Sequence, residues 1–128
     1  MSKQLDLIKR DMKWAKAIYD SNDELDLSLS CYLCQQTVER LCNYSFEMKG
    51  KPHIITHDIV KLCEKLKELN LEVPEYIESH ADEITYWEKG SRYNINFVAS
   101  KKSVLATLEC CEVWLSKFEH GSQKMDCF

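Results

Sequence analysis

The feature that most constrains this sequence is a long helical segment, residues 27–48, that is apolar on more than one side. One stripe of small and apolar side chains recurs there every three or four residues, namely Leu27, Cys31, Cys34, Val38, Leu41, Ser45 and Met48. A second line on another face consists of Leu29, Leu33, Gln36, Arg40 and Tyr44. A helix with two apolar faces must contact more than one neighbour. We therefore expect either the central helix of a bundle or a helix shared between the core and a subunit interface.

Polar residues gather in the middle of this segment, where we expect them to be partly buried. They are Gln35, Gln36, Glu39 and Arg40. A buried polar group left without a hydrogen-bond partner costs about 1–3 kcal/mol. The segment is therefore expected to make specific polar contacts at this point.

The rest of the chain shows helical periodicity and no strand-like alternation. Helices are predicted over residues 3–20, from 24 to about 49, from Thr56 to Asn70, from Pro74 to about 90, and from Ser100 to Gly121. Thr56 is predicted as an N-cap and Asn70 as a left-handed residue at the following helix end. The expected fold is all-α, a five-helix antiparallel up-and-down bundle. One domain is expected over residues 1–121, followed by a flexible C-terminal tail, 122–128.

Composition narrows the class of protein further. The chain has 128 residues, only three glycines and two prolines, and a net charge of −4. The scarcity of turn residues argues against a β-sandwich or barrel, and the acidic balance gives no electrostatic reason to bind RNA or a membrane surface. No apolar run approaches the roughly 20 residues that span a bilayer, and no secretory signal is apparent at the N-terminus. The sequence predicts a cytoplasmic protein.

The seven cysteines lie mostly on helix faces beside leucines. Their odd number and the missing signal indicate reduced thiols that pack as small apolar side chains. Cys31 and Cys34, followed by His53 and His57, superficially match a Cys2His2 zinc pattern. The cysteines, however, fall in the middle of a helix, and the interval is longer than the about twelve residues of structural fingers. We predict no metal site and no cofactor.

Three further features have a functional and a structural interpretation. The pair His57-Asp58 is found in metal-dependent phosphohydrolases, but His53, His80 and His120 lie in no second ligand motif, so the first turn of a helix is the preferred interpretation. The tryptophans at 14, 87 and 114 are expected in the core. Arg92, in a polar connection after an aromatic-rich helix, would either bind an anion bidentately or pair with Glu39 or Glu88.

Taken together, these residues resemble a HEPN domain, an all-helical family. Residues 35–40, Gln-Gln-Thr-Val-Glu-Arg, are similar to the family's Gln-Gln-Ala-x-Glu-Lys run. Residues 56–59, Thr-His-Asp-Ile, are similar to its His-Asp-Leu segment, and Tyr86, Arg92 and Tyr93 stand where the family has an aromatic followed by Arg-Tyr-Pro. The match covers about residues 5–118, although Asn94 replaces the family's proline and constrains the turn less.

The ribonuclease signature of HEPN toxins is absent. That signature is an arginine followed, after four to six intervening residues, by a histidine. The chain's arginines, Arg10, Arg40 and Arg92, have no histidine at that distance. Phe97, Val98 and Ala99 follow Arg92 at the corresponding places and cannot transfer protons. The resemblance therefore implies the fold and a paired assembly without the nuclease.

The resemblance implies a non-catalytic HEPN protein, a homodimer that binds a nucleotide-like ligand or a protein partner. In the family the partner is commonly a minimal nucleotidyltransferase, in a two-component, toxin–antitoxin-like system. Arg92 would hold phosphate and Tyr93 or Tyr86 would stack on a base. Gln36, Arg40 and His57 would orient groups nearby.

Two alternatives stay open. The chain would be a divergent metal-independent ribonuclease if His57 or His80 replaced the missing histidine, since general acid–base cleavage needs a group that titrates near neutrality. It would be a structural dimerisation module if the two-faced helix served oligomerisation. In that case, changing Tyr44 or Leu33 to lysine should give monomers.

Overall fold

A computed structural model describes residues 3–21, 23–93 and 100–119, and all secondary structure in these ranges is helical. The described residues form six helices, α1 (Lys3–Asp20), α2 (Glu24–Met48), α3 (Ile59–Glu68), α4 (Glu75–Ser79), α5 (Ala81–Tyr93) and α6 (Lys101–Glu119). The all-α prediction is confirmed, but the predicted count of five helices was one too low. No helix in the described ranges is both long and apolar enough to cross a membrane. The predicted tail, 122–128, lies outside the described residues.

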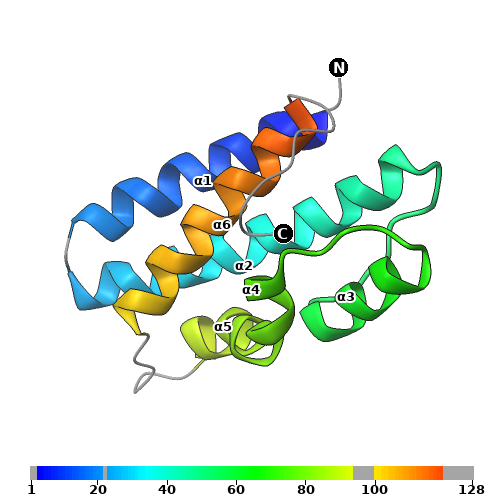
Figure 1. Cartoon of the computed structure of the whole chain (residues 1–128). Coiled ribbons are helices and arrows are strands. Elements are labelled where there is room, and N and C mark those ends of the chain that lie inside the picture. Colours follow the sequence, from blue (N-terminus) through cyan, green and yellow to red (C-terminus); the bar gives the residue numbers. More distant parts are fainter. Residues whose placement is uncertain (1–2, 22, 94–99, 120–128) are drawn as a thin grey trace.

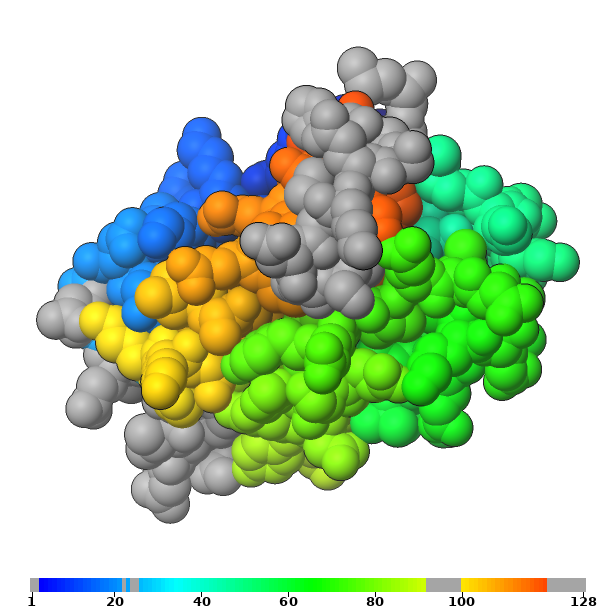
Figure 2. All heavy atoms as spheres, in the orientation of Figure 1, coloured from blue at the N-terminus to red at the C-terminus, as the bar shows by residue number. Residues whose placement is uncertain are grey.

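The longest helix, α2, is the centre of the bundle, as its two apolar faces predict. It packs against α1, α3, α5 and α6. In Figure 1, α1 lies along one side of α2 and α3 and α5 lie along the other, while α6 crosses in front of α2 and α4 lies next to α5 and α6. Figure 2 shows α6, α4 and α5 forming the surface in front of the middle of α2. Val38 is fully buried and Leu33 half-buried, whereas Leu29, near the start of the helix, is 49% exposed.

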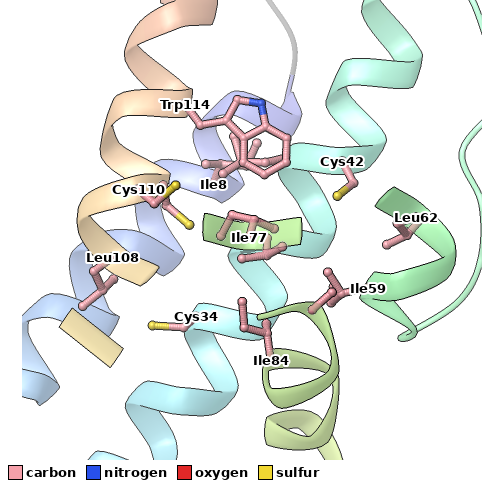
Figure 3. Packing of buried hydrophobic residues seen from close by; sticks show 14 of the residues in the cluster. Ile8, Cys34, Cys42, Ile59, Leu62, Ile77, Ile84, Leu108, Cys110 and Trp114 are labelled. Atoms are coloured by element: carbon pink, nitrogen blue, oxygen red, sulfur yellow. The ribbon is translucent and has the colours of Figure 1, made fainter. Parts of the chain in front are cut away.

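The core receives side chains from every helix. Figure 3 shows Ile8 of α1, Cys34 and Cys42 of α2, Leu62 of α3, Ile77 of α4, Ile84 of α5 and Trp114 of α6 converging. Buried cysteines that form no disulfide contribute to this core, namely Cys31, Cys34, Cys42, Cys63, Cys110 and Cys111. Trp87 and Trp114 are buried as predicted, but Trp14 is 53% exposed. The prediction for Trp14 was wrong because Ile8, Met12 and Ala15 form the buried stripe of α1, and Trp14 lies off that stripe.

A break at His80 divides the predicted helix of residues 74–90 into α4 and α5. The His80 ring stacks on Tyr76, with ring centroids 3.9 Å apart, and its Nδ1 lies 2.9 Å from the Tyr76 carbonyl oxygen. His80 itself has φ −113° and ψ 17°, outside the α-helical range. The backbone N–H of His80 also donates to the Tyr76 carbonyl oxygen, at 3.0 Å, so this oxygen contacts both the backbone and the ring of His80 where α4 ends. At its other end α5 continues to Tyr93, so residues 91–93 belong to its last turn instead of a polar connection.

The start of α3 also differs from the prediction by two residues. Asp58, not Thr56, is the N-cap, and its Oδ1 accepts hydrogen bonds from the backbone N–H groups of Val60 (3.0 Å) and Lys61 (3.4 Å). The Thr56 hydroxyl oxygen accepts a hydrogen bond from the Asp58 N–H at 3.1 Å. Thr56 thus helps to orient the N-cap from two residues upstream. Asn70 has φ 58°, which confirms the left-handed residue after this helix.

Candidate functional site

A buried glutamine at the middle of α2 fixes the loop that precedes α3. The Gln35 side chain is fully buried, and its Nε2 donates to Glu39 Oε2 (2.7 Å) and to the His57 carbonyl oxygen (3.2 Å). The same Glu39 oxygen lies 3.0 Å from His57 Nδ1. Both the backbone and the imidazole of His57 are therefore held by α2, while 60% of the His57 side chain remains exposed.

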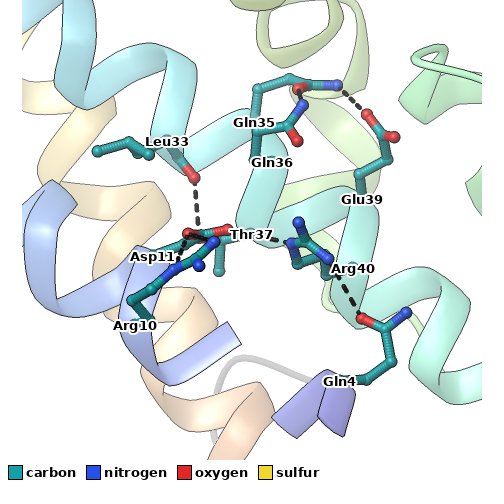
Figure 4. Close-up of polar contacts among 9 residues, drawn as sticks. All are labelled: Gln4, Arg10, Asp11, Leu33, Gln35, Gln36, Thr37, Glu39 and Arg40. Atoms are coloured by element: carbon teal, nitrogen blue, oxygen red, sulfur yellow. Dashed lines mark hydrogen bonds and ion pairs between the residues drawn. The ribbon is translucent and has the colours of Figure 1, made fainter. Parts of the chain in front are cut away.

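Gln36 belongs to the same hydrogen-bonded group. Its Nε2 donates to Gln35 Oε1 at 3.0 Å, which orients the amide that holds Glu39 and His57. Figure 4 shows Gln35, Gln36 and Glu39 connected in this way along one side of α2. The expectation that the polar residues of this helix would be partly buried and specifically paired is confirmed.

His57 opens onto a groove between the start of α3 and the outer face of α5, which we call the His57 groove. It has a volume of about 590 Å³ and is lined by Thr56, His57, Asp58, Val60, Asp82, Thr85, Tyr86, Glu88 and Lys89. Thr85 joins its two walls, because its hydroxyl accepts from the Ile59 N–H (2.9 Å) and donates to the Ala81 carbonyl oxygen (2.7 Å). Tyr86 is 49% exposed and offers a ring to a ligand.

The groove carries more negative than positive charge. Asp58, Asp82 and Glu88 contribute carboxylates, and Lys89 contributes the one lysine ammonium among the lining residues. Carboxylates accept hydrogen bonds from hydroxyl and amino groups and repel phosphates. The groove is thus suited to a planar group with donors and unsuited to holding several phosphates.

Arg40 lies outside this groove. Its Nε donates to Asp11 Oδ2 at 3.1 Å, and one terminal nitrogen reaches Gln4 Oε1 at 3.5 Å, so its guanidinium joins α2 to α1 (Figure 4). Asp11 also accepts from Arg10 Nη2 at 3.1 Å. Arg40 therefore contacts α1, whereas Glu39, its neighbour on α2, contacts His57.

The structure brings some of the six predicted site residues close together and separates others. His57 and Tyr86 share the groove, and Gln36 supports it through Gln35. The backbone of Arg92 and Tyr93 lies in the last turn of α5, about one turn beyond Glu88, and their side chains are outside what the structure describes. The sequence did not single out Thr85 as a site residue, because no motif includes it. The contact between Gln35 and Glu39 could be predicted, since residues four apart on a helix are neighbours.

Metal-ligating side chains do not gather in the described ranges: no three of the histidines, cysteines and carboxylates there are placed to share an ion. Burial raises the pKa of the Cys31 and Cys63 thiols to about 12. It raises the pKa of Cys34 and Cys42 well above the ordinary value. These thiols stay protonated at neutral pH, so they are poor ligands and poor nucleophiles.

Comparison with known proteins agrees with this architecture. The model of the HEPN domain family matches residues 6–120. The crystal structure of TT1696 from Thermus thermophilus superposes with a TM-score of 0.69 at 18% identity, covering 91% of this chain and 94% of that one. No curated protein sequence matches the chain. Because the family model spans nearly all of the sequence, this chain is a member of the HEPN domain family.

Proposed function

We propose that this chain is a non-catalytic HEPN protein that binds a nucleotide-like ligand in the His57 groove. The observation that carries the proposal is that His57, held by Glu39 at 3.0 Å, lines the same groove as the half-exposed Tyr86. These residues come from distant parts of the chain, and Thr85 ties the segments that bear them together.

The chemistry of the groove suits the nucleoside part of such a ligand. A base stacked on an aromatic side chain contributes about 1–3 kcal/mol to binding. Asp82 and Glu88 would accept hydrogen bonds from ribose hydroxyls or from an exocyclic amino group. Gln36 would act through Gln35 to keep His57 in place, and Arg40 would support the site by fixing α2 against α1.

The phosphate would lie beyond the carboxylates, at the end of α5. Arg92 is in the last turn of that helix and would bind one phosphate bidentately, with Tyr93 as a second ring. Because three carboxylates line the groove, each further phosphate would add repulsion. The expected order of affinity is nucleoside monophosphate, then nucleoside, then triphosphate without a divalent cation.

Calorimetric titration with adenosine, guanosine, cytidine and uridine monophosphates tests this proposal. We expect at least one to bind and to raise the melting temperature, with Tyr86→Ala weakening it about tenfold or more, in line with the loss of one stacked base. Trp14→Ala, which removes an equally exposed ring from α1, is the matched control and should change nothing. If none of the four binds, the ligand proposal is wrong; if Arg92→Ala binds as tightly as the wild type, the phosphate assignment is wrong.

The resemblance supports a protein partner as well. We expect a homodimer that binds a minimal nucleotidyltransferase in a two-component, toxin–antitoxin-like system. Co-expression with a nucleotidyltransferase encoded in the adjacent reading frame tests this. Stable co-elution supports the pairing, and separate elution of two folded proteins contradicts it.

One observation favours a ribonuclease as second candidate. An imidazole held by a carboxylate and 60% exposed, as His57 is, has the arrangement of a general acid–base pair. The carboxylates around it oppose RNA binding. Incubation of the purified protein with RNA, beside His57→Ala, separates the candidates: cleavage lost in the variant supports the enzyme, and equal absence of cleavage supports the binding protein.

A further inference from the structure

A second cavity, of about 310 Å³, lies at the C-terminal end of α2 and shares no residue with the His57 groove. It is an open pocket lined by the last turns of α2 and α6, by Lys49 just after α2, and by the segment that links α3 to α4. Its volume is at the lower end of the roughly 300–1,000 Å³ typical of small-molecule sites. The cavity is therefore of a size for one small ligand.

Apolar side chains form the walls of this cavity. Trp114, only 1% exposed, lines it together with Phe118 and Leu71. Phe118 is held by an edge-to-face contact with Tyr44, with ring centroids 4.9 Å apart. Met48, 62% exposed, is a flexible apolar side chain at the rim. These walls suit an apolar body that is inserted between aromatic rings.

The charged residues that line the cavity have a positive balance, unlike the chain as a whole. The lining residues include two lysines, Lys49 and Lys117, and one carboxylate, that of Glu72, although the protein has a net charge of −4. The Lys117 ammonium forms an ion pair with Glu72. Only 20% of the Lys117 side chain is exposed, whereas Glu72 is 65% exposed. Lys117 is thus a partly buried cation whose present carboxylate partner lies mostly in water.

We propose that this cavity binds a small alkyl carboxylate. Its hydrocarbon tail would lie against Trp114, Phe118 and Leu71, and its carboxylate would take the place of Glu72 on Lys117, with Lys49 alongside. The positive balance of the lining residues favours an anionic head, and the apolar walls favour an aliphatic body. The site is independent of the nucleotide proposal.

A series of carboxylates from butanoate to decanoate, titrated below their micelle concentrations, tests the site. Trp114 lines the cavity, so tryptophan fluorescence in a Trp14→Phe background reports binding. We expect affinity to rise about fourfold with each added methylene until the cavity is full. Octanol and octylammonium, which have the same tail, should bind about tenfold or more weakly than octanoate. Equal binding of octanol would overturn the anionic assignment, and no binding of any carboxylate would overturn the site.

Single substitutions test where the carboxylate and the hydrocarbon tail of the ligand bind. Lys117→Met should weaken octanoate about tenfold, whereas Glu72→Gln, which removes the competing carboxylate, should strengthen it. Lys102→Met, the same change at an exposed position of α6, should have no effect. Ser45→Leu should fill the cavity and abolish binding while the helical circular dichroism is retained. If Lys117→Met and Lys102→Met weaken binding equally, the carboxylate is not at this cavity.

Discussion

Asp11 and Arg40 form an ion pair that fastens α1 to α2, with Asp11 Oδ2 3.1 Å from Arg40 Nε. The Asp11 side chain is 6% exposed, and its second oxygen accepts from Arg10 Nη2 at 3.1 Å. One nearly buried carboxylate is therefore neutralised by two guanidinium groups of different exposure. Such charge-assisted hydrogen bonds are among the stronger polar interactions in proteins. The position of Arg40 is thus explained by packing between the two helices.

Removing this carboxylate should destabilise the fold. Asp11→Ala leaves the part-buried Arg40 guanidinium without its anion, and we expect the free energy of unfolding to fall by about 2 kcal/mol. The loss should be smaller than the 3–5 kcal/mol of a fully buried pair, because Arg40 is 27% exposed. Urea denaturation followed by circular dichroism measures it. Glu109→Ala, at an exposed position of α6, should change stability by less than about 0.5 kcal/mol, and a similar result for Asp11→Ala would contradict the assignment.

The start of α3 offers a second test, because Asp58 and Thr56, two residues apart, accept hydrogen bonds from different backbone N–H groups there. Asp58→Ala removes the acceptor of two backbone N–H groups and should lower stability by about 1 kcal/mol. Thr56→Ala removes one N–H acceptor outside the helix and should have a smaller effect. Thermal unfolding of the two variants shows which substitution lowers the stability more. A larger loss for Thr56→Ala would show that the helix begins earlier than Asp58.

The helices could be predicted from sequence wherever one apolar stripe was continuous. The bounds of α1 and the central place of α2 followed from stripes that repeat every three or four residues. The break at His80 could not be predicted in this way, because Tyr76, Ile77, Ala81, Ile84 and Trp87 keep helical spacing across it. At the break the His80 backbone has φ −113° and ψ 17° and its ring contacts the Tyr76 carbonyl, and apolar periodicity detects neither feature.

The candidate site could be predicted only in part, for a similar reason. A local pattern drew attention to Gln36 and His57. The partner of His57, however, is Glu39 on α2, and the partner of Arg40 is Asp11 on α1. Which helix meets which polar residue is decided by the packing of the whole bundle. Thr85 illustrates the limit, since its hydroxyl joins α5 to α3 and nothing in its neighbourhood distinguishes it from other surface threonines.

The buried thiols predict a loss of stability at high pH. Burial raises the pKa of Cys63 from 9.0 to about 12, so the folded protein keeps a proton that the unfolded chain releases above pH 9. Stability from this group is complete below pH 9 and falls as the pH rises towards 12. At pH 10 the loss is about 1 kcal/mol for one thiol. Urea titrations at pH 8 and pH 10 measure this loss. Between these pH values the free energy of unfolding of Cys63→Ala should fall by less than that of the wild type, and the difference should equal the loss from one thiol. Val60→Ala, which creates a small cavity without removing a titrating group, should decline as the wild type does.

The expected homodimer is tested best at Leu29, not at Tyr44. Tyr44 is 7% exposed and packs edge-to-face on Phe118, so Tyr44→Lys would unfold the core and would not report on an interface. Leu29 lies on the central helix and is 49% exposed, which leaves an apolar side chain available to a second copy. If the dimer uses this part of α2, Leu29→Lys buries an ammonium at the interface and should convert dimer to monomer in light scattering at micromolar concentration. Ile55→Lys makes the same kind of change at a fully exposed loop position, so it should leave the mass unchanged. A monomeric wild type would exclude the homodimer at that concentration, and a dimer that tolerates Leu29→Lys would move the interface to another face of the molecule.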